Sequence, residues 1–141
     1  MMAMVLVSSV GGGGGAGGND GEAPMPKLHT RTAILMPVYN EDAAAVFARL
    51  RAMDASIAET GAARNFDIFV ISDTRDAQIA LAEQACFARF RREAHCNVYY
   101  RIRKENTGRK AGNVADWVSR WGSGYEHMLV LDADSLMTGE A

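Results

Sequence analysis

The segment TAILMPVYNED, residues 32–42, decides the fold class that the sequence predicts. It opens with a continuous apolar run, which is typical of a strand that is buried on both faces of a sheet. A polar turn follows, and apolar residues then recur at helical spacing, at Val46, Leu50, Met53 and Ile57. The segment therefore predicts a strand followed directly by a helix, with Asn40 or Asp42 as its N-cap and Gly61 at its C-terminal end.

The same alternation continues along the rest of the chain. Residues 66–71 and 97–103 read as two further strands, and residues 127–131 as a fourth. Apolar residues at helical spacing indicate helices over residues 79–90 and 114–121. Such alternation indicates βαβ units, so we predict an α/β fold with a mostly parallel four-stranded sheet and flanking helices. We expect the fourth strand to be left as an exposed edge.

The first 30 residues differ in composition from the rest. Eight of the 14 glycines lie between Gly11 and Gly21, in a run typical of flexible linkers. The apolar start is shorter than the roughly 20 residues of a membrane span, and it lacks the basic residues of a secretory signal. We therefore predict a Gly-rich flexible leader without a fold or a function over residues 1–30, and a folded part over residues 31–141.

Composition and charge exclude some classes of protein. The 141 residues include 15 Lys and Arg against 17 Asp and Glu, which gives a net charge of −2. A nucleic-acid-binding domain is usually strongly basic, so we expect no nucleic-acid partner. Cys86 and Cys96 have neither the CxxC nor the histidine spacing of a zinc site. We expect two reduced thiols, with a single disulfide as the alternative.

Polar clusters follow all four predicted strands, at residues 39–41, 72–73, 104–113 and 132–134. The carboxyl ends of parallel strands meet at one edge of a sheet, and ligands of such sheets bind there. The sequence therefore predicts one ligand site to which all four clusters contribute.

Two of these clusters suit a metal ion and a phosphate group. Asp132 and Asp134 follow the fourth strand one residue apart, so their carboxylates point to the same side. Mg²⁺ or Mn²⁺ prefers such oxygen ligands and would relieve their repulsion, the alternative being a capped turn with a solvated carboxylate. Lys110 stands among small residues, including Gly112, that let the backbone approach a phosphate group. The alternative there is a solvated basic face.

Asp73, at the end of the second strand, has three interpretations. Its carboxylate suits the N–H of a flat base such as uracil, and it equally suits the N-cap of the next helix. A phosphoacceptor of the receiver type is the third, because Glu41 and Asp42 follow the first strand. Tyr39 is positioned either to stack on a base or to cap the strand end. The two tryptophans of residues 114–121 are interpreted as core packing.

The order of these motifs resembles family 2 glycosyltransferases of the GT-A fold. In both, the motifs Pro-Val-Tyr-Asn-Glu, Ser-Asp, Lys-Ala-Gly-Asn and Leu-Asp-Ala-Asp follow one another, here over residues 32–140. Residues 31–42, 108–113, 120–122 and 130–135 are similar to the membrane-bound branch that builds osmoregulated periplasmic glucans. The resemblance implies the Rossmann-like, nucleotide-binding half of a GT-A domain, truncated.

The resemblance also implies a role for each matching position. The nucleotide-sugar site would comprise Pro37, Tyr39, Asn40, Glu41, Asp73, Lys110, Gly112, Asn113 and Asp132. Within it, Asp73 would bind the uracil edge, and Lys110 would approach the diphosphate on a loop that Gly112 and Asn113 shape. Asp134, together with Asp132, would hold Mg²⁺ or Mn²⁺.

The implied reaction is the transfer of glucose from UDP-glucose to a β-glucan acceptor with inversion, at the cytoplasmic face of the bacterial inner membrane. Family members carry their catalytic base, a QxxRW acceptor motif and membrane spans in other segments, and none of these occurs in the 141 residues. We therefore expect a soluble donor-binding part that is inactive alone. The alternative is a non-catalytic module that binds a nucleotide or a phosphate.

Overall fold

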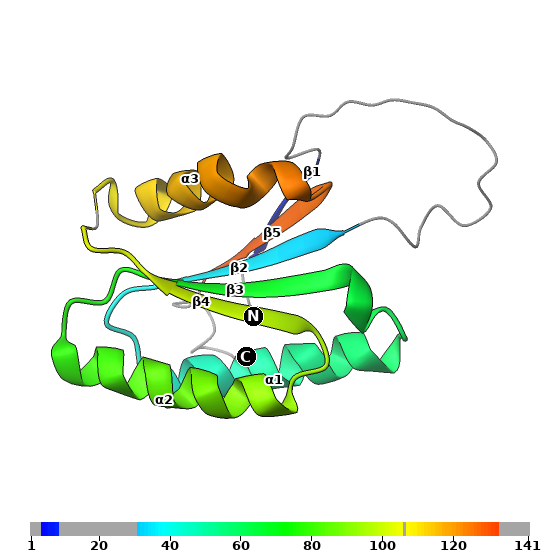
Figure 1. Cartoon of the computed structure of the whole chain (residues 1–141), viewed down its shortest axis with the longest axis horizontal. Coiled ribbons are helices and arrows are strands. Elements are labelled where there is room, and N and C mark those ends of the chain that lie inside the picture. The colour runs from blue at the N-terminus through cyan, green and yellow to red at the C-terminus, as the bar shows by residue number, and fades with distance from the viewer. Residues whose placement is uncertain (1–3, 9–30, 106, 133–141) are drawn as a thin grey trace.

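The computed structural model describes residues 4–8, 31–105 and 107–132. The main elements are β1 (Met4–Ser8), β2 (Thr32–Val38), α1 (Ala43–Glu59), β3 (Phe66–Ser72), α2 (Ala77–Glu93), β4 (Asn97–Ile102), α3 (Arg109–Trp121) and β5 (His127–Leu131). The strands form one sheet in the order β1-β5-β2-β3-β4. Helices α1 and α2 cover one face of this sheet, and α3 covers the other (Figure 1).

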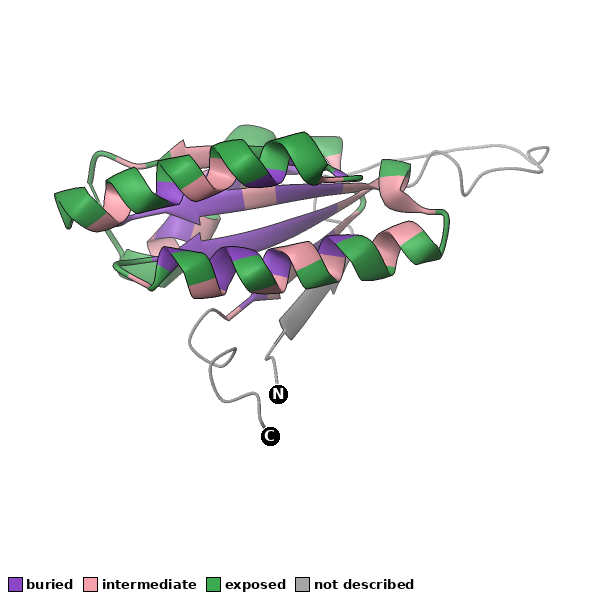
Figure 2. Cartoon of the chain, turned by 90° about the horizontal axis from the view of Figure 1, so that it is seen from below, coloured by how far each residue is buried: buried purple, intermediate pink, exposed green. Residues whose placement is uncertain are grey.

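The four predicted strands and their parallel pairing are confirmed. Strand β2 pairs in parallel with β3 and β5, and β3 pairs in parallel with β4. The apolar run at the start of β2 is fully buried, because helices cover both faces of the sheet (Figure 2). The α/β fold with flanking helices that the sequence predicts is therefore the observed one.

Strand β1 was not expected, since no element was predicted within the first 30 residues. It pairs antiparallel with β5, from Met4 opposite Leu131 to Ser8 opposite His127. The expectation that β5 forms an exposed edge is therefore wrong, because its second edge carries β1. Without β1, strand β5 would present a row of unpaired N–H and C=O groups at the edge of the sheet. The sequence MVLVS of β1 has a high strand propensity, so it can pair with these groups.

The helix ends follow from capping side chains. Asp42, rather than Asn40, is the N-cap of α1, because its Oδ1 accepts a hydrogen bond from the N–H of Ala44 at 3.1 Å. Gly61 follows the C-terminal end of α1 with a φ of +81°, as predicted for a C-terminal stop. Helix α3 begins at Arg109, five residues before the predicted start at residue 114. Its first turn is polar, so the apolar periodicity did not reveal it.

Two apolar layers hold the sheet between the helices. Between the sheet and the α1–α2 pair, the larger layer includes Ile34, Phe47, Leu50, Ile68 and Phe90. On the α3 side, Trp117 is fully buried against residues of β2, β3 and β5. Core packing is thus confirmed for Trp117, whereas Trp121 is 40% exposed and contacts the guanidinium of Arg101. Full burial of one large aromatic side chain stabilises a fold by about 2–3 kcal/mol.

Two further predictions concern the cysteines and the membrane. Cys86 and Cys96 are both free thiols, as the sequence led us to expect.

Within the described ranges, no helix combines the length and the apolar character that crossing a bilayer requires.

Candidate functional site

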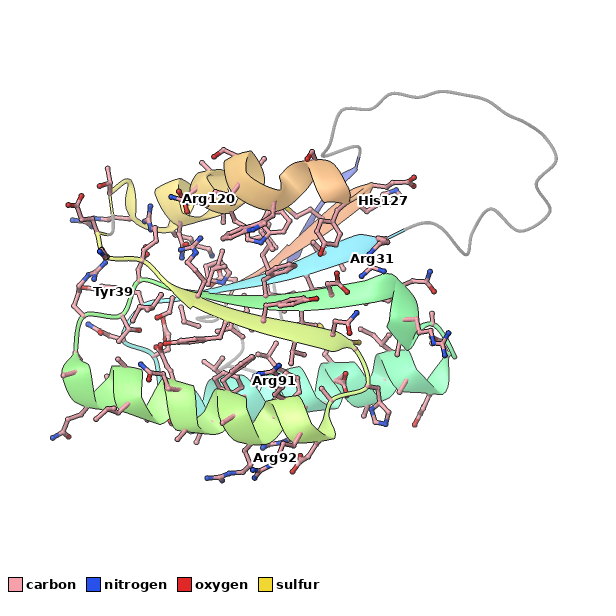
Figure 3. The ribbon with its side chains drawn as sticks, in the orientation of Figure 1. Arg31, Tyr39, Arg91, Arg92, Arg120 and His127 are labelled. Atoms are coloured by element: carbon pink, nitrogen blue, oxygen red, sulfur yellow. The ribbon has the colours of Figure 1, made fainter. Side chains whose placement is uncertain are left out.

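The carboxyl ends of the parallel strands bring the predicted clusters together. Val38, Ser72 and Ile102 are register partners at the ends of β2, β3 and β4. The residue that follows each of them therefore lies at the same edge of the sheet, on the left of Figure 1. Tyr39 is labelled at this edge in Figure 3, and its side chain is half exposed. We call this edge the carboxyl rim.

The opposite edge is closed by hydrogen bonds. The buried carboxylate of Asp67 accepts hydrogen bonds from Arg31, from Asn97 at 3.1 Å and from the hydroxyl of Tyr125. The bond to Asp67 raises the pKa of Arg31, and burial raises the pKa of Tyr125. Figure 3 shows Arg31 at the end of the sheet opposite Tyr39. The polar groups here bind one another, so a ligand site is better sought at the carboxyl rim.

Asp73 and Arg103 form a two-pronged ion pair at the carboxyl rim. Nε of Arg103 lies 2.7 Å from Oδ1 of Asp73, and Nη2 lies 2.8 Å from Oδ2. The Asp73 side chain is only 3% exposed, and its hydrogen bond raises the pKa of Arg103. The N-cap of α2 is Asp76, whose Oδ1 accepts from Gln78 and Ile79, so the capping interpretation of Asp73 is wrong.

Arg103 is a site residue that the sequence analysis did not single out. Its Nη2 also donates to the carbonyl oxygens of Thr107 at 3.1 Å and Arg109 at 3.3 Å. Arg103 thus joins the end of β3 to the turn before α3. The sequence did contain a signal for this pair: basic Arg103 directly follows β4, and acidic Asp73 directly follows the neighbouring strand β3.

The turn into α3 depends on Gly112. A Cβ atom at this position would lie 2.0 Å from the carbonyl oxygen of Thr107, which no side chain tolerates. Gly108 precedes the helix with a φ of +75°, a conformation that favours glycine, and its carbonyl accepts from the N–H of Gly112 at 2.9 Å. These two glycines fold the chain tightly enough to bring Lys110 to the carboxyl rim.

Asn113 fixes the same turn from inside the protein. It is 1% exposed, and its Nδ2 donates to the carbonyl oxygen of Ile71 at 2.9 Å. Its Oδ1 accepts from Nη1 of Arg101 at 2.9 Å. The Asn113 side chain therefore shapes the start of α3 instead of facing solvent.

Lys110 and Asp132 approach each other from α3 and from the end of β5. Nζ of Lys110 lies 3.4 Å from Oδ1 of Asp132, and their side chains are 50% and 36% exposed. Both groups are thus accessible to a ligand, and they bring a cation and a carboxylate to one place. Among the remaining predicted residues, Pro37 is buried within β2, and Glu41 is partly buried in the turn before α1.

The predicted metal site is described only in part, because Asp134 lies outside the described residues. Within the described ranges, no group of three or more His, Cys, Asp or Glu side chains is arranged to hold a metal ion. Asp132 supplies one partly exposed carboxylate of the kind that Mg²⁺ and Mn²⁺ prefer.

The chain is similar in sequence to several known proteins. No protein-family model matches the chain. It is 95% identical over 124 residues to the glucans biosynthesis glucosyltransferase H of Caulobacter vibrioides. The chain is a close homologue of this glucosyltransferase. Proteins of the same name from Xylella fastidiosa and Bradyrhizobium diazoefficiens are 50% identical over 131 residues and 52% identical over 122 residues.

The relatives named glucosyltransferase H are much longer than this chain. The three matches cover 88%, 92% and 86% of the 141 residues, but only 19%, 20% and 16% of the relatives. The chain thus spans about a fifth of the length of the glucosyltransferase H proteins that it matches. The homology extends over most of the residues that build the sheet and its carboxyl rim.

Proposed function

We propose that this chain forms the donor-binding part of an inverting family 2 glycosyltransferase that extends the β-glucan backbone of osmoregulated periplasmic glucans. UDP-glucose is the proposed donor. The observation that carries the proposal is the convergence at one rim of a buried Asp73–Arg103 pair and an accessible Lys110–Asp132 pair. Homology to proteins named glucans biosynthesis glucosyltransferase H supports it.

The Asp73–Arg103 pair suits a nucleobase. Each carboxylate oxygen can accept more than one hydrogen bond, so Asp73 can accept the ring N–H of uracil while Arg103 still holds it. Arg103 fixes the orientation of the carboxylate, which lowers the entropy cost of binding a flat base. The half-exposed ring of Tyr39, at the end of the neighbouring strand, offers a stacking surface.

The Lys110–Asp132 pair suits a diphosphate with a divalent cation. Lys110 lies in the first turn of α3, where the helix dipole also favours negative charge. A diphosphate competes well with a single carboxylate for the ammonium group, because it carries more charge. Asp132, with Asp134, would hold Mg²⁺ or Mn²⁺, and the ion would offset the charge of the departing diphosphate. Lys110 would stabilise the same charge.

The proposed reaction is a direct displacement at the anomeric carbon. An acceptor hydroxyl attacks, UDP leaves, and a carboxylate must take the proton of that hydroxyl. Because the chain spans about a fifth of its relatives, we assign to it donor binding alone, and we assign the base, the glucan site and contact with the inner membrane to other segments of the whole protein.

Base selectivity tests the proposal. Calorimetric titration of the 141-residue chain with UDP and with ADP, in the presence of Mn²⁺, compares the two bases directly. We expect UDP to bind at least tenfold more tightly than ADP, since a single base hydrogen bond is worth about a factor of ten. Asp73→Asn should reduce this preference. Equal affinities for UDP, ADP and inorganic diphosphate would instead favour a non-catalytic phosphate-binding module.

A further inference from the structure

A buried carboxylate that the proposed function does not use lies directly beneath the carboxyl rim. Glu83, on α2, is 2% exposed. Acidic side chains are almost never buried so completely unless polar groups pair with them. Three hydroxyl groups do so here: those of Ser72 at 2.7 Å, Tyr100 at 2.8 Å and Thr74. Burial and the bond to Glu83 raise the pKa of Tyr100, so its hydroxyl remains a donor.

The carboxylate of Glu83 sets the direction of these hydroxyl groups. The Thr74 hydroxyl donates its proton to Oε2 of Glu83. The lone pairs of the Thr74 hydroxyl are then free to accept the backbone N–H of Asn40 at 2.9 Å. Ser72 behaves in the same way, donating to Glu83 and accepting the backbone N–H of Thr74 at 3.1 Å.

We call the hydrogen bonds that lead from Glu83 through the Thr74 hydroxyl to Asn40 the relay. The relay ends at Asn40, whose backbone conformation is uncommon. Asn40 has a φ of +52°, a conformation that costs free energy for a residue other than glycine. The Thr74 hydroxyl holds its N–H, and its side-chain Oδ1 accepts from the N–H groups of Arg75 and Asp76, both at 3.1 Å. The turn after β2 is thereby fastened to the turn after β3.

The two fastened turns carry the residues that we propose bind the nucleobase. Tyr39 and Glu41 flank Asn40 on one turn, and Asp73 precedes Thr74 on the other. A shift of Asn40 would therefore move the stacking surface relative to the carboxylate that binds the base. The contacts that hold the turn carrying Lys110 do not include Glu83 or the Thr74 hydroxyl; they come from Gly112, Asn113 and Arg103.

We propose that Glu83 is a positioning residue for the nucleobase half of the site, acting through the Thr74 hydroxyl on Asn40. It touches neither the base nor the diphosphate. The inference rests on the proposed function for its ligand, but its structural part concerns the free chain. Removing the relay should weaken base recognition and leave diphosphate recognition intact.

Two substitutions test the relay, with calorimetry of UDP and of inorganic diphosphate as the readout. Glu83→Gln places an NH₂ group where Thr74 needs an acceptor, and Thr74→Val removes the hydroxyl at nearly constant volume. We expect each to weaken UDP binding about tenfold, because a shift of Tyr39 relative to Asp73 would cost the equivalent of one hydrogen bond to the base, and to change diphosphate binding less than twofold. Thr74→Ser should restore UDP binding, and Glu93→Gln, on the exposed face of α2, should change neither.

The outcomes separate this inference from the proposed function. Equal losses for UDP and diphosphate, or wild-type UDP affinity in a folded Thr74→Val variant, would overturn the positioning role. Should Glu83→Gln fail to fold, the Thr74→Val and Thr74→Ser pair carries the test. Hydrogen exchange at the Asn40 amide, measured without ligand, should be faster in Thr74→Val than in Thr74→Ser. Failure of the wild type to bind UDP would count against the proposed function, and unchanged exchange would count against the relay.

Discussion

The guanidinium of Arg103 holds both carboxylate oxygens of Asp73, across the ends of two neighbouring strands. The two contacts of 2.7 and 2.8 Å form the paired geometry that arginine can make and lysine cannot. Since both side chains are largely buried, the pair fixes Asp73 in one orientation before any ligand arrives.

Arg103→Ala should lower both stability and nucleotide affinity. Removing one partner of a buried ion pair leaves an uncompensated charge, so we expect the free energy of unfolding in urea to fall by about 3–4 kcal/mol. Arg103→Lys should recover part of the stability but not the fixed orientation of Asp73. Arg92→Ala, an exposed change on α2, is the control and should alter the free energy by less than about 0.5 kcal/mol (Figure 3). An Arg103→Ala variant as stable as that control would contradict the assigned role.

Gly112→Ala should disrupt the turn that presents Lys110. The added Cβ would lie 2.0 Å from the carbonyl oxygen of Thr107, so the backbone must move. We expect a loss of about 2–3 kcal/mol in thermal or urea unfolding, and weaker binding of inorganic diphosphate. Gly124→Ala is a matched control, because nothing lies within 4 Å of a Cβ at that position. Equal effects of the two substitutions would show that the close approach at Gly112 is unimportant.

Lys110→Met should separate ligand binding from stability. The exposed contact with Asp132 contributes little to folding, so the free energy of unfolding should change by less than about 0.5 kcal/mol. Affinity for UDP and for diphosphate should fall about tenfold, since the variant loses a charged hydrogen bond to phosphate. Arg91→Met, an exposed change on α2, should leave both affinities unchanged. Unaltered diphosphate binding in Lys110→Met would remove this residue from the site.

Asp54 should make stability depend on acidic pH. Burial alone would raise the pKa of its carboxyl, but hydrogen bonds from the backbone of Cys96 and from His95 lower it below the ordinary value. Because its pKa is lower in the folded state, ionised Asp54 stabilises the fold at pH values above the pKa of the unfolded chain, about 3.9. This stabilisation is lost as the pH falls through the pKa of the folded state. Asp54→Asn should therefore cost about 1–2 kcal/mol near pH 7.

The difference between wild type and Asp54→Asn should shrink as the pH falls below the pKa of the unfolded chain, about 3.9, as measured by urea unfolding at several pH values. Glu59→Gln, at the exposed end of the same helix, provides the control. A difference that stayed constant from pH 7 to pH 3 would contradict the lowered pKa of Asp54.

Much of the fold could be predicted because its signals are local. The apolar run at Ala33 to Met36, the cap at Asp42 and the glycine at Gly61 each fix a strand or a helix end through neighbouring residues. The start of α3 was missed because its first turn, including Lys110, is polar and shows no apolar periodicity. Strand β1 was missed because its pairing partner lies more than 100 residues away along the chain.

The site could be predicted as a set of clusters but not as a set of contacts. Parallel topology alone brings Asp73 and Asp132 to one rim, so the location followed from the order of strands. The partners of those carboxylates depend on side-chain directions, and these emerge only when the sheet is assembled. Arg103 and Glu83 belong to this second group, since each contacts side chains that belong to other elements of the fold.

The most direct test of the nucleotide-sugar site is a calorimetric titration of the chain with UDP, with and without Mn²⁺. We predict tighter UDP binding with Mn²⁺, and an Asp132→Asn variant that loses most of this gain while its unfolding curve stays that of the wild type. The same UDP affinity with and without Mn²⁺ would contradict the metal–diphosphate site at Asp132, and no binding in either condition would contradict the donor-binding role of the carboxyl rim.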